Sequence, residues 1–105
     1  MNVRFSDASV RCGVTPDELQ RLLTGRSLVL DVALPRSHIF RLSVQPSLLG
    51  GWQLDSDPTG IWVCIPRLDL EALSQSLASR QGIEQKFATA GEKETRVMFE
   101  VEQRV

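Results

Sequence analysis

The same order of apolar patterns occurs twice along this chain of 105 residues. Each time, two runs that alternate polar and apolar residues lead into a helix start, and two further alternating runs follow the helix. Val14 in the first unit matches Ile65 in the second, 51 positions later (65 − 14). Phe40 matches Val97, 57 positions later (97 − 40), which places six extra residues in the second helix and its exit. We therefore predict an internally duplicated strand-strand-helix-strand-strand unit.

This order of elements predicts an α+β fold. Because the connections inside each predicted hairpin are short, the strands that they join must run antiparallel. We expect a single domain with two helices and a mostly antiparallel sheet, either open or barrel-like. The first repeat covers about residues 1–45, a joint rich in proline and glycine covers 46–51, and the second repeat covers about 52–105.

The first predicted helix has a well-defined start at Thr15. The Thr15 hydroxyl can accept a hydrogen bond from the backbone N–H of Glu18, and the Glu18 side chain can reach back to Thr15. Pro16 suits the first helical position, where no backbone N–H is needed. Gly25 is placed to end the helix in a left-handed conformation.

The second predicted helix follows Pro66. Leu70, Leu73 and Leu77 recur at helical spacing and form its apolar face, and Gly82 ends it. Both helices are short, so we expect tertiary packing to hold them.

The charge balance limits the classes of partner. With 12 basic and 13 acidic residues, the net charge is −1. Nucleic-acid binding through counterion release needs a concentrated basic surface, so we expect no nucleic-acid partner. No run approaches the ~20 apolar residues of a membrane span, so we expect no membrane contact. Residues 1–10 lack a signal pattern, and the expected location is the cytoplasm of a bacterium-like cell.

The sequence indicates neither a metal site nor a cofactor site. Cys12, Cys64 and His38 are the only cysteine and histidine residues, and they are widely separated, whereas a structural zinc site needs four such ligands. Neither a GxGxxG run nor a Walker A run is present, so we expect no cofactor. Cys12 alternates with inward-facing valines, and we predict that it is buried and unpaired.

Three arginines are candidates for anion binding, because each is predicted to point away from the core: Arg4, Arg11 and Arg41. In the first hairpin Phe5 should face Val10, and Arg4 should then face Arg11 on the opposite side. Like charges directly opposite each other destabilise a sheet, so something must relieve them. Two explanations stay open. One is a neighbouring carboxylate, such as Asp31, Glu100 or Glu102, and the other is an anionic ligand.

The outward face of the second unit is predicted to be more apolar. It carries Trp62, Cys64 and Met98 at the positions that Arg11, Gly13 and Arg41 hold in the first unit. Tryptophan is enriched in the cores of interfaces. This face is therefore either covered inside the monomer or contacts a protein partner, including a second copy of the chain.

These patterns favour a non-enzymatic binding or protein-interaction module. Nucleophilic catalysis needs a Ser or Cys beside a base, and the one histidine lies in a predicted turn. The alternative is a small enzyme or ligand-binding subunit that acts on an anionic small molecule through the outward-facing arginines. A deep pocket lined by arginines and a carboxylate would favour that alternative, and a shallow apolar patch around Trp62 would favour the interaction module.

The segments at residues 9–15 (SVRCGVT) and 97–102 (VMFEVE) carry a family resemblance. The first runs directly into an acidic helix start, and the second is an apolar strand with glutamates. In these features the chain resembles a family of small bacterial proteins of similar length to which no activity is assigned. Members of that family end in a Glu-Lys-Asp-Phe type of sequence, where this chain has Glu102-Gln103-Arg104-Val105. The resemblance covers most of the chain and implies the fold, and it implies no chemistry.

Overall fold

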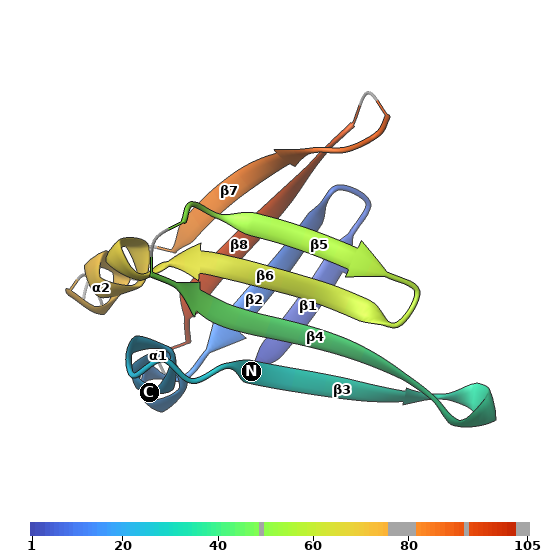
Figure 1. The fold of residues 1–105 in the computed structure, drawn as a ribbon, viewed down its shortest axis with the longest axis horizontal. Helices are drawn as coiled ribbons and strands as arrows, with labels where there is room; N and C mark the ends of the chain where they lie inside the picture. Colours follow the sequence, from blue (N-terminus) through green and yellow to red (C-terminus); the bar gives the residue numbers. More distant parts are fainter. Residues whose placement is uncertain (49, 76–81, 92, 103–105) are drawn as a thin grey trace.

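The computed structural model describes residues 1–48, 50–75, 82–91 and 93–102. These residues form two α-helices and eight strands, together with one short 3₁₀ turn at Pro35–Ser37. In chain order the elements are β1 (Asn2–Ser6), β2 (Ser9–Val14), α1 (Pro16–Leu23), β3 (Leu28–Leu34), β4 (His38–Ser47), β5 (Gln53–Asp57), β6 (Gly60–Pro66), α2 (Arg67–Gln75), β7 (Ile83–Ala88) and β8 (Glu94–Val101) (Figure 1).

The strands form two four-stranded sheets, and each sheet combines one hairpin of the first unit with one of the second. The terminal sheet has the strand order β1-β2-β8-β7, and the central sheet has the order β3-β4-β6-β5. Two antiparallel hairpins meet in each sheet through a parallel pair, β2 with β8 and β4 with β6. The predicted α+β fold with two helices and mostly antiparallel strands is confirmed. The barrel-like alternative is not, since the described strands do not close into a barrel.

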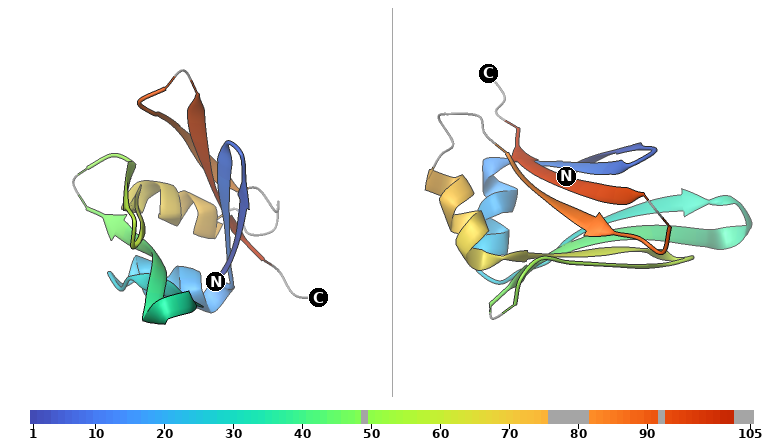
Figure 2. Two further views of the ribbon diagram at one scale, coloured as in Figure 1. Left: turned by 90° about the vertical axis from the view of Figure 1, so that its right-hand side faces the viewer. Right: turned by 90° about the horizontal axis from the view of Figure 1, so that it is seen from above.

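Both helices lie at one end of the molecule, and the hairpin turns lie at the other (Figure 1). α1 and α2 contact each other, and the two sheets extend from them in the same general direction, one facing the other (Figure 2). The buried core draws on the inward faces of both sheets and on both helices, and its fully enclosed side chains include Cys12, Val14, Leu19, Leu22, Val44, Val63, Ile65, Leu70, Val97 and Phe99. Cys12 is buried and unpaired, as predicted.

The helix start predicted at Thr15 is confirmed. The Glu18 amide donates to Thr15 Oγ1 at 3.2 Å, and the Thr15 amide donates to Glu18 Oε1 at 3.0 Å. The Met1 amino group donates to Glu18 Oε2 at 2.7 Å. Burial alone would raise the pKa of the Glu18 carboxyl, but the hydrogen bonds from Met1 and Thr15 together lower it. Gly25 has a φ of 92°, the left-handed conformation expected of it.

The second unit repeats this arrangement with different chemistry. Pro66 takes the place of Thr15 and offers no hydroxyl to cap α2. Trp52, 51 positions after Met1 (52 − 1), donates from Nε1 to Asp69 Oδ2 at 2.6 Å. In each unit, therefore, the residue before the first strand is tied to a carboxylate in the first turn of the helix. Leu77, expected on the apolar face of α2, lies outside the described residues.

The strand register shows which residues of the two units are equivalent. Val10 pairs with Val97, and Ile61 pairs with Leu42. Ile61 is equivalent to Val10, so their partners Leu42 and Val97 are equivalent to each other. Val97 lies 55 positions after Leu42 (97 − 42). The predicted offset of 57 is wrong for this part of the chain, and four extra residues separate the units instead of six (55 − 51). Alternation with a period of two is identical at both offsets, so only the register distinguishes them.

The joint predicted at 46–51 begins too early. β4 continues through Pro46 to Ser47, and these residues pair with the last two residues of β6. The connection between the two units is therefore shorter than predicted. The origin of the units by duplication stays a prediction, but every strand pair of one unit has an equivalent pair in the other.

Candidate functional site

The β3–β4 hairpin extends beyond the sheet to which it belongs. Pairing between β4 and β6 ends at Arg41 and Gly60, and past this point the two strands of the hairpin pair only with each other. We call its exposed apolar side chains the apolar arm: Val29 (51% exposed), Val32 (45%), Leu34 (45%) and Ile39 (56%). The register places two of them on each face of the hairpin, so both of its faces are apolar.

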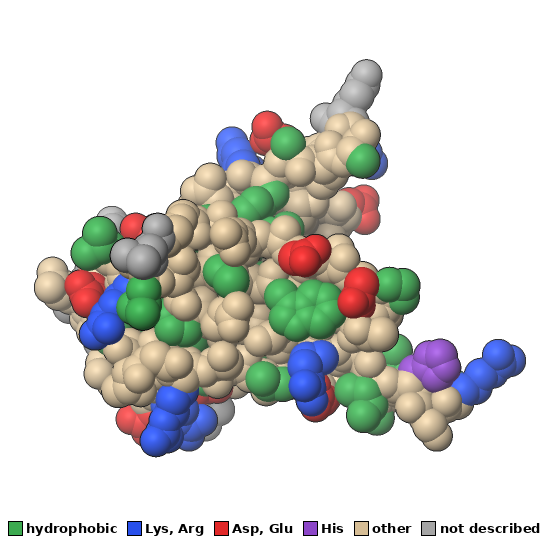
Figure 3. All heavy atoms as spheres, viewed as in Figure 1, with side chains coloured by type: hydrophobic (Ala, Val, Ile, Leu, Met, Phe, Trp, Pro, Cys, Tyr) green, Lys and Arg blue, Asp and Glu red, His purple; other side chains and the backbone are tan. Residues whose placement is uncertain are grey.

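Trp62 lies on the outward face of the central sheet and is half-buried. Its register partner Ser43 is buried. A hollow of about 270 Å³ lies beside Trp62 and is also lined by Ile39, Arg41 and Thr59. Figure 3 shows this face, where hydrophobic side chains lie between acidic and basic ones. Through Ile39 the apolar arm and Trp62 form one continuous surface.

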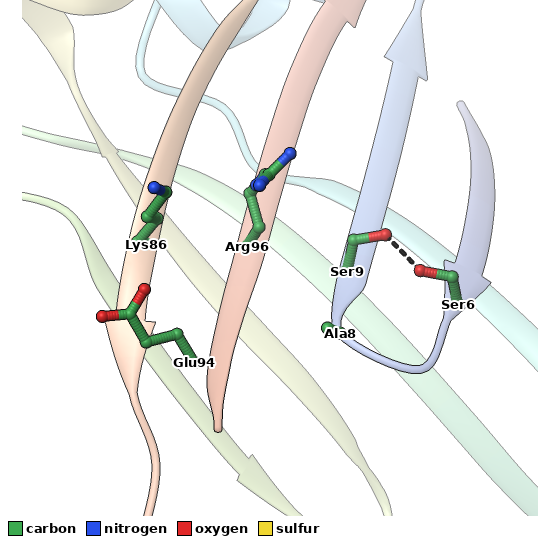
Figure 4. Close-up of a pocket in the computed structure, with 6 residues that line it drawn as sticks. All are labelled: Ser6, Ala8, Ser9, Lys86, Glu94 and Arg96. Atoms are coloured by element: carbon green, nitrogen blue, oxygen red, sulfur yellow. Dashed lines mark hydrogen bonds between the residues drawn. The ribbon is translucent and has the colours of Figure 1, made fainter. Parts of the chain in front are cut away.

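The outward face of the terminal sheet carries two pairs of like charges. Arg4 faces Arg11 across β1 and β2, as predicted, and Lys86 faces Arg96 across β7 and β8. We call these four side chains the cationic face. Two hollows of about 310 and 260 Å³ lie on it. The larger is lined by Ser6, Ala8, Ser9, Lys86, Glu94 and Arg96 (Figure 4).

The arginines differ in their counterions. Arg41 donates to both carboxylate oxygens of Asp31, at 2.8 and 3.0 Å, and this hydrogen bonding lowers the pKa of Asp31. Arg96 has a looser partner in Glu84, at 3.7 Å. Among the described residues, no carboxylate lies within 4.0 Å of Arg4, Arg11 or Lys86.

The carboxylates expected to relieve Arg4 and Arg11 do not do so within the described part of the chain. Asp31 pairs with an arginine of the other sheet. Glu102 Oε1 instead accepts a hydrogen bond from Asn2 Nδ2 at 3.4 Å, and Glu100 forms no ion pair with a described residue. Arg11 Nη2 donates to the sulfur of Met98, at 3.6 Å. Among the residues that the structure describes, the like charges of the first hairpin therefore have no acidic partner.

The two predicted residue sets are each divided between the sheets. Arg4 and Arg11 lie on the terminal sheet, whereas Arg41 lies on the central sheet. Trp62 and Cys64 lie together on β6, but Met98 lies on β8 in the terminal sheet. The corrected register also changes the equivalences.

With an offset of 55, Met98 takes the place of Ser43 and not that of Arg41. Arg41 and Arg96 are the equivalent pair, and each donates its backbone N–H to the turn of the neighbouring hairpin, at Thr59 and Ala8.

Two groups of residues were missed by the reasoning from sequence. Lys86 and Arg96 were not predicted to join the arginines, because nothing local shows that β8 pairs with β2. The apolar arm was missed because Val32 and Leu34 were taken as inward-facing core. Their alternation is correct, but the hairpin projects past the opposing sheet and leaves them exposed. The length of the hairpin relative to β6 was the signal that could have identified it.

The described residues contain no group of three or more His, Cys, Asp or Glu side chains that could hold a metal ion. Neither helix in the described part of the chain is long and apolar enough to cross a bilayer. Burial raises the pKa of the Cys12 thiol to about 11, and Cys64 is half-buried with its sulfur accepting a hydrogen bond from Gln45 at 3.2 Å.

Comparison with family models, with curated proteins and with solved structures finds no match for this chain. The family resemblance inferred from residues 9–15 and 97–102 therefore stays a proposal.

Proposed function

We propose that the protein is a protein-interaction module and that its apolar arm pairs with a second copy of the chain. The observation that supports this most strongly is the exposure of four large apolar side chains on one hairpin. Removing apolar surface from water contributes about 25 cal/mol for each Å². Exposed apolar patches of this kind mark interaction sites in soluble proteins.

The second unit provides an internal control, because the β7–β8 hairpin is equivalent to β3–β4. Glu84 takes the place of Val29, and Glu94 takes the place of Ile39. The same backbone therefore tolerates charged side chains at these positions. Stability of the monomer does not require apolar residues there, so a contact outside the monomer is the better explanation.

The edge of the central sheet points to a second copy as the occupant. β3 is an edge strand, and six of its seven residues are apolar (LVLDVAL). The one charge of β3, Asp31, also points outward but is paired with Arg41, whereas β5 (QLDSD) and β7 (IEQKFA) each carry two charged residues and β1 (NVRFS) carries Arg4. Proteins use such charges to keep strand edges from pairing with other chains. An unprotected edge pairs most simply with its own copy about a twofold axis, which closes the assembly.

The proposal is tested by the size of the protein in solution. We expect wild-type protein to have the mass of two chains in light scattering at high micromolar concentration. The double variant Val29→Glu and Ile39→Glu carries the residues found at the equivalent positions of the other hairpin, so we expect it to fold and to have the mass of one chain.

Two controls complete the experiment. Glu84→Gln and Glu94→Gln, made together on the equivalent hairpin, should leave the dimer unchanged. Far-ultraviolet circular dichroism should show the same secondary structure in all variants. A wild type that stays monomeric over the concentration series would overturn the proposal, as would a Val29→Glu and Ile39→Glu variant that stays dimeric.

We also propose a cytoplasmic location. The support is that Cys12 and Cys64 are unpaired, as cysteines are in reducing compartments. Fractionation of the source cells, followed by detection of the protein with an antibody, tests this location.

A further inference from the structure

We infer that the cationic face of the terminal sheet binds a small phosphate monoester. This inference is independent of the proposed self-association, because the cationic face and the apolar arm lie on different sheets. Its central observation is the presence of two like-charged cross-strand pairs on one face, Arg4 with Arg11 and Lys86 with Arg96.

The central sheet shows that the fold does not demand this arrangement. Asp31 takes the place of Lys86 there, and it neutralises Arg41, the equivalent of Arg96. In place of that ion pair, the terminal sheet has two cations side by side. Because like charges opposite each other destabilise a sheet, this arrangement lowers stability unless an anion relieves it.

The β1–β2 hairpin of the terminal sheet also has two cations opposite each other, and its equivalent in the central sheet, β5–β6, does not. The equivalents of Arg4 and Arg11 are Asp55 and Trp62, which do not repel each other. Among the described residues, Arg4, Arg11 and Lys86 have no carboxylate partner, and Arg96 has only the 3.7 Å contact with Glu84. The charges of this face are therefore available to an external anion.

The larger hollow offers hydroxyl groups beside the cations. Ser6 Oγ and Ser9 Oγ lie 2.5 Å apart and share one hydrogen bond, which uses one of their two hydroxyl protons. The other proton is free to donate. In register, Ser9 is adjacent to Arg96, and Arg96 is adjacent to Lys86. Figure 4 shows these side chains on three neighbouring strands. A phosphate group placed there accepts hydrogen bonds from an ammonium, a guanidinium and a hydroxyl, and charged donors of this kind form its strongest contacts.

The acidic residues of this face determine the size and character of the ligand. Glu84 and Glu100 line the smaller hollow beside Arg11, and Glu94 lines the larger one. An extended polyanion would meet these carboxylates and be repelled. A compact ligand can place its phosphate between Lys86 and Arg96 and offer a hydroxyl group to Glu94. A phosphorylated polyol or sugar has both groups.

The inference is tested by titrating ¹⁵N-labelled protein with glycerol 3-phosphate, inorganic phosphate and glycerol, at constant ionic strength. We expect glycerol 3-phosphate to shift the amide signals of β1, β2, β7 and β8 and to leave those of β5 and β6 unchanged. Inorganic phosphate should bind the same residues a few-fold more weakly, because it cannot offer a hydroxyl on carbon to Glu94. Glycerol alone should produce no shifts.

Equivalent arginines provide a matched pair of variants. Arg96→Ser and Arg41→Ser each remove one positive charge from equivalent positions of the two sheets. We expect Arg96→Ser to weaken binding of glycerol 3-phosphate at least about tenfold and Arg41→Ser to leave it unchanged. If Arg96→Ser fails to fold, Lys86→Asp takes its place, since it restores the acid–arginine pair seen in the central sheet.

Three results would overturn the inference. The first is that added chloride at the same ionic strength produces the same shifts, which would indicate screening alone. The second is equal weakening by Arg41→Ser and Arg96→Ser. The third is that the shifts map to the central sheet or are absent at millimolar ligand.

Discussion

The terminal and central sheets share one strand order and one register, yet their outward faces carry different side chains. Where the terminal sheet has Arg4 and Arg11, the central sheet has Asp55 and Trp62. The inward faces differ much less, since the equivalent positions Cys12 and Val63 are both fully buried. Packing between the sheets therefore constrains one face of each strand, and the outward faces are free to acquire separate functions. The predictions below test how far this equivalence extends.

The largest expected effects come from equivalent leucines of the two helices. Leu19 in α1 and Leu70 in α2 are fully buried in one core. Replacing either with alanine should lower the free energy of unfolding by about 2–5 kcal/mol, through lost burial and the cavity left behind. Urea denaturation measures both losses. A loss under about 1 kcal/mol for one variant and a full loss for the other would break the equivalence of the two units.

A smaller effect is expected where the helix starts differ. Thr15→Ala removes the acceptor of the Glu18 amide and should cost about 0.5–2 kcal/mol of stability. Pro66→Ala at the equivalent position removes no such acceptor, so it should not lower stability through loss of a helix cap. Comparing the two variants by thermal unfolding separates capping from the other roles of these positions. An equal loss in both would show that the Thr15 hydroxyl contributes nothing.

The Glu18 carboxyl should make the first unit sensitive to acid. Its pKa is lower in the folded protein than in the unfolded chain, so its contribution to stability is present above the unfolded pKa and is lost as pH falls through the folded pKa. We expect Glu18→Gln to flatten the acid side of the stability curve, measured by urea denaturation at several pH values. A variant curve parallel to that of the wild type would contradict the assignment.

The smallest expected effect is a difference in thiol reactivity between the two cysteines. Cys12 is fully buried and its thiol pKa is raised to about 11, whereas Cys64 is half-buried on the outward face. Because the thiolate is the reactive form, a thiol reagent should label Cys64 in the folded protein well before Cys12. Mass spectrometry of the labelled peptides measures this order. Labelling of Cys12 first would mean that the inward face of β2 is open.

Much of the fold could be predicted from local patterns. The hairpins, the capping box at Thr15 and the alternation of buried residues all depend on neighbours in sequence. The pairing of β2 with β8 could not be predicted, because it joins residues almost a whole chain length apart. The offset of 57 failed for the same reason, since a shift of two residues preserves alternation and changes only the partner strand.

The candidate site was only partly predictable. Arg4 and Arg11 were placed opposite each other correctly, because a hairpin fixes its own register. Lys86 and Arg96 complete the cationic face only through the pairing of β8 with β2. The apolar arm could not be identified from alternation, since the same pattern describes a strand that is covered and one that projects beyond its sheet.

Comparing amide hydrogen exchange in β3 with that in β7 tests most directly the proposal that β3 pairs with a second copy of the chain. The two strands are equivalent edges of the two sheets, and they differ in their side chains. If β3 pairs with a second copy, its outward-pointing amides should exchange more slowly as protein concentration rises, while those of β7 stay fast and do not change. Equal exchange in β3 and β7, independent of concentration, would contradict the account.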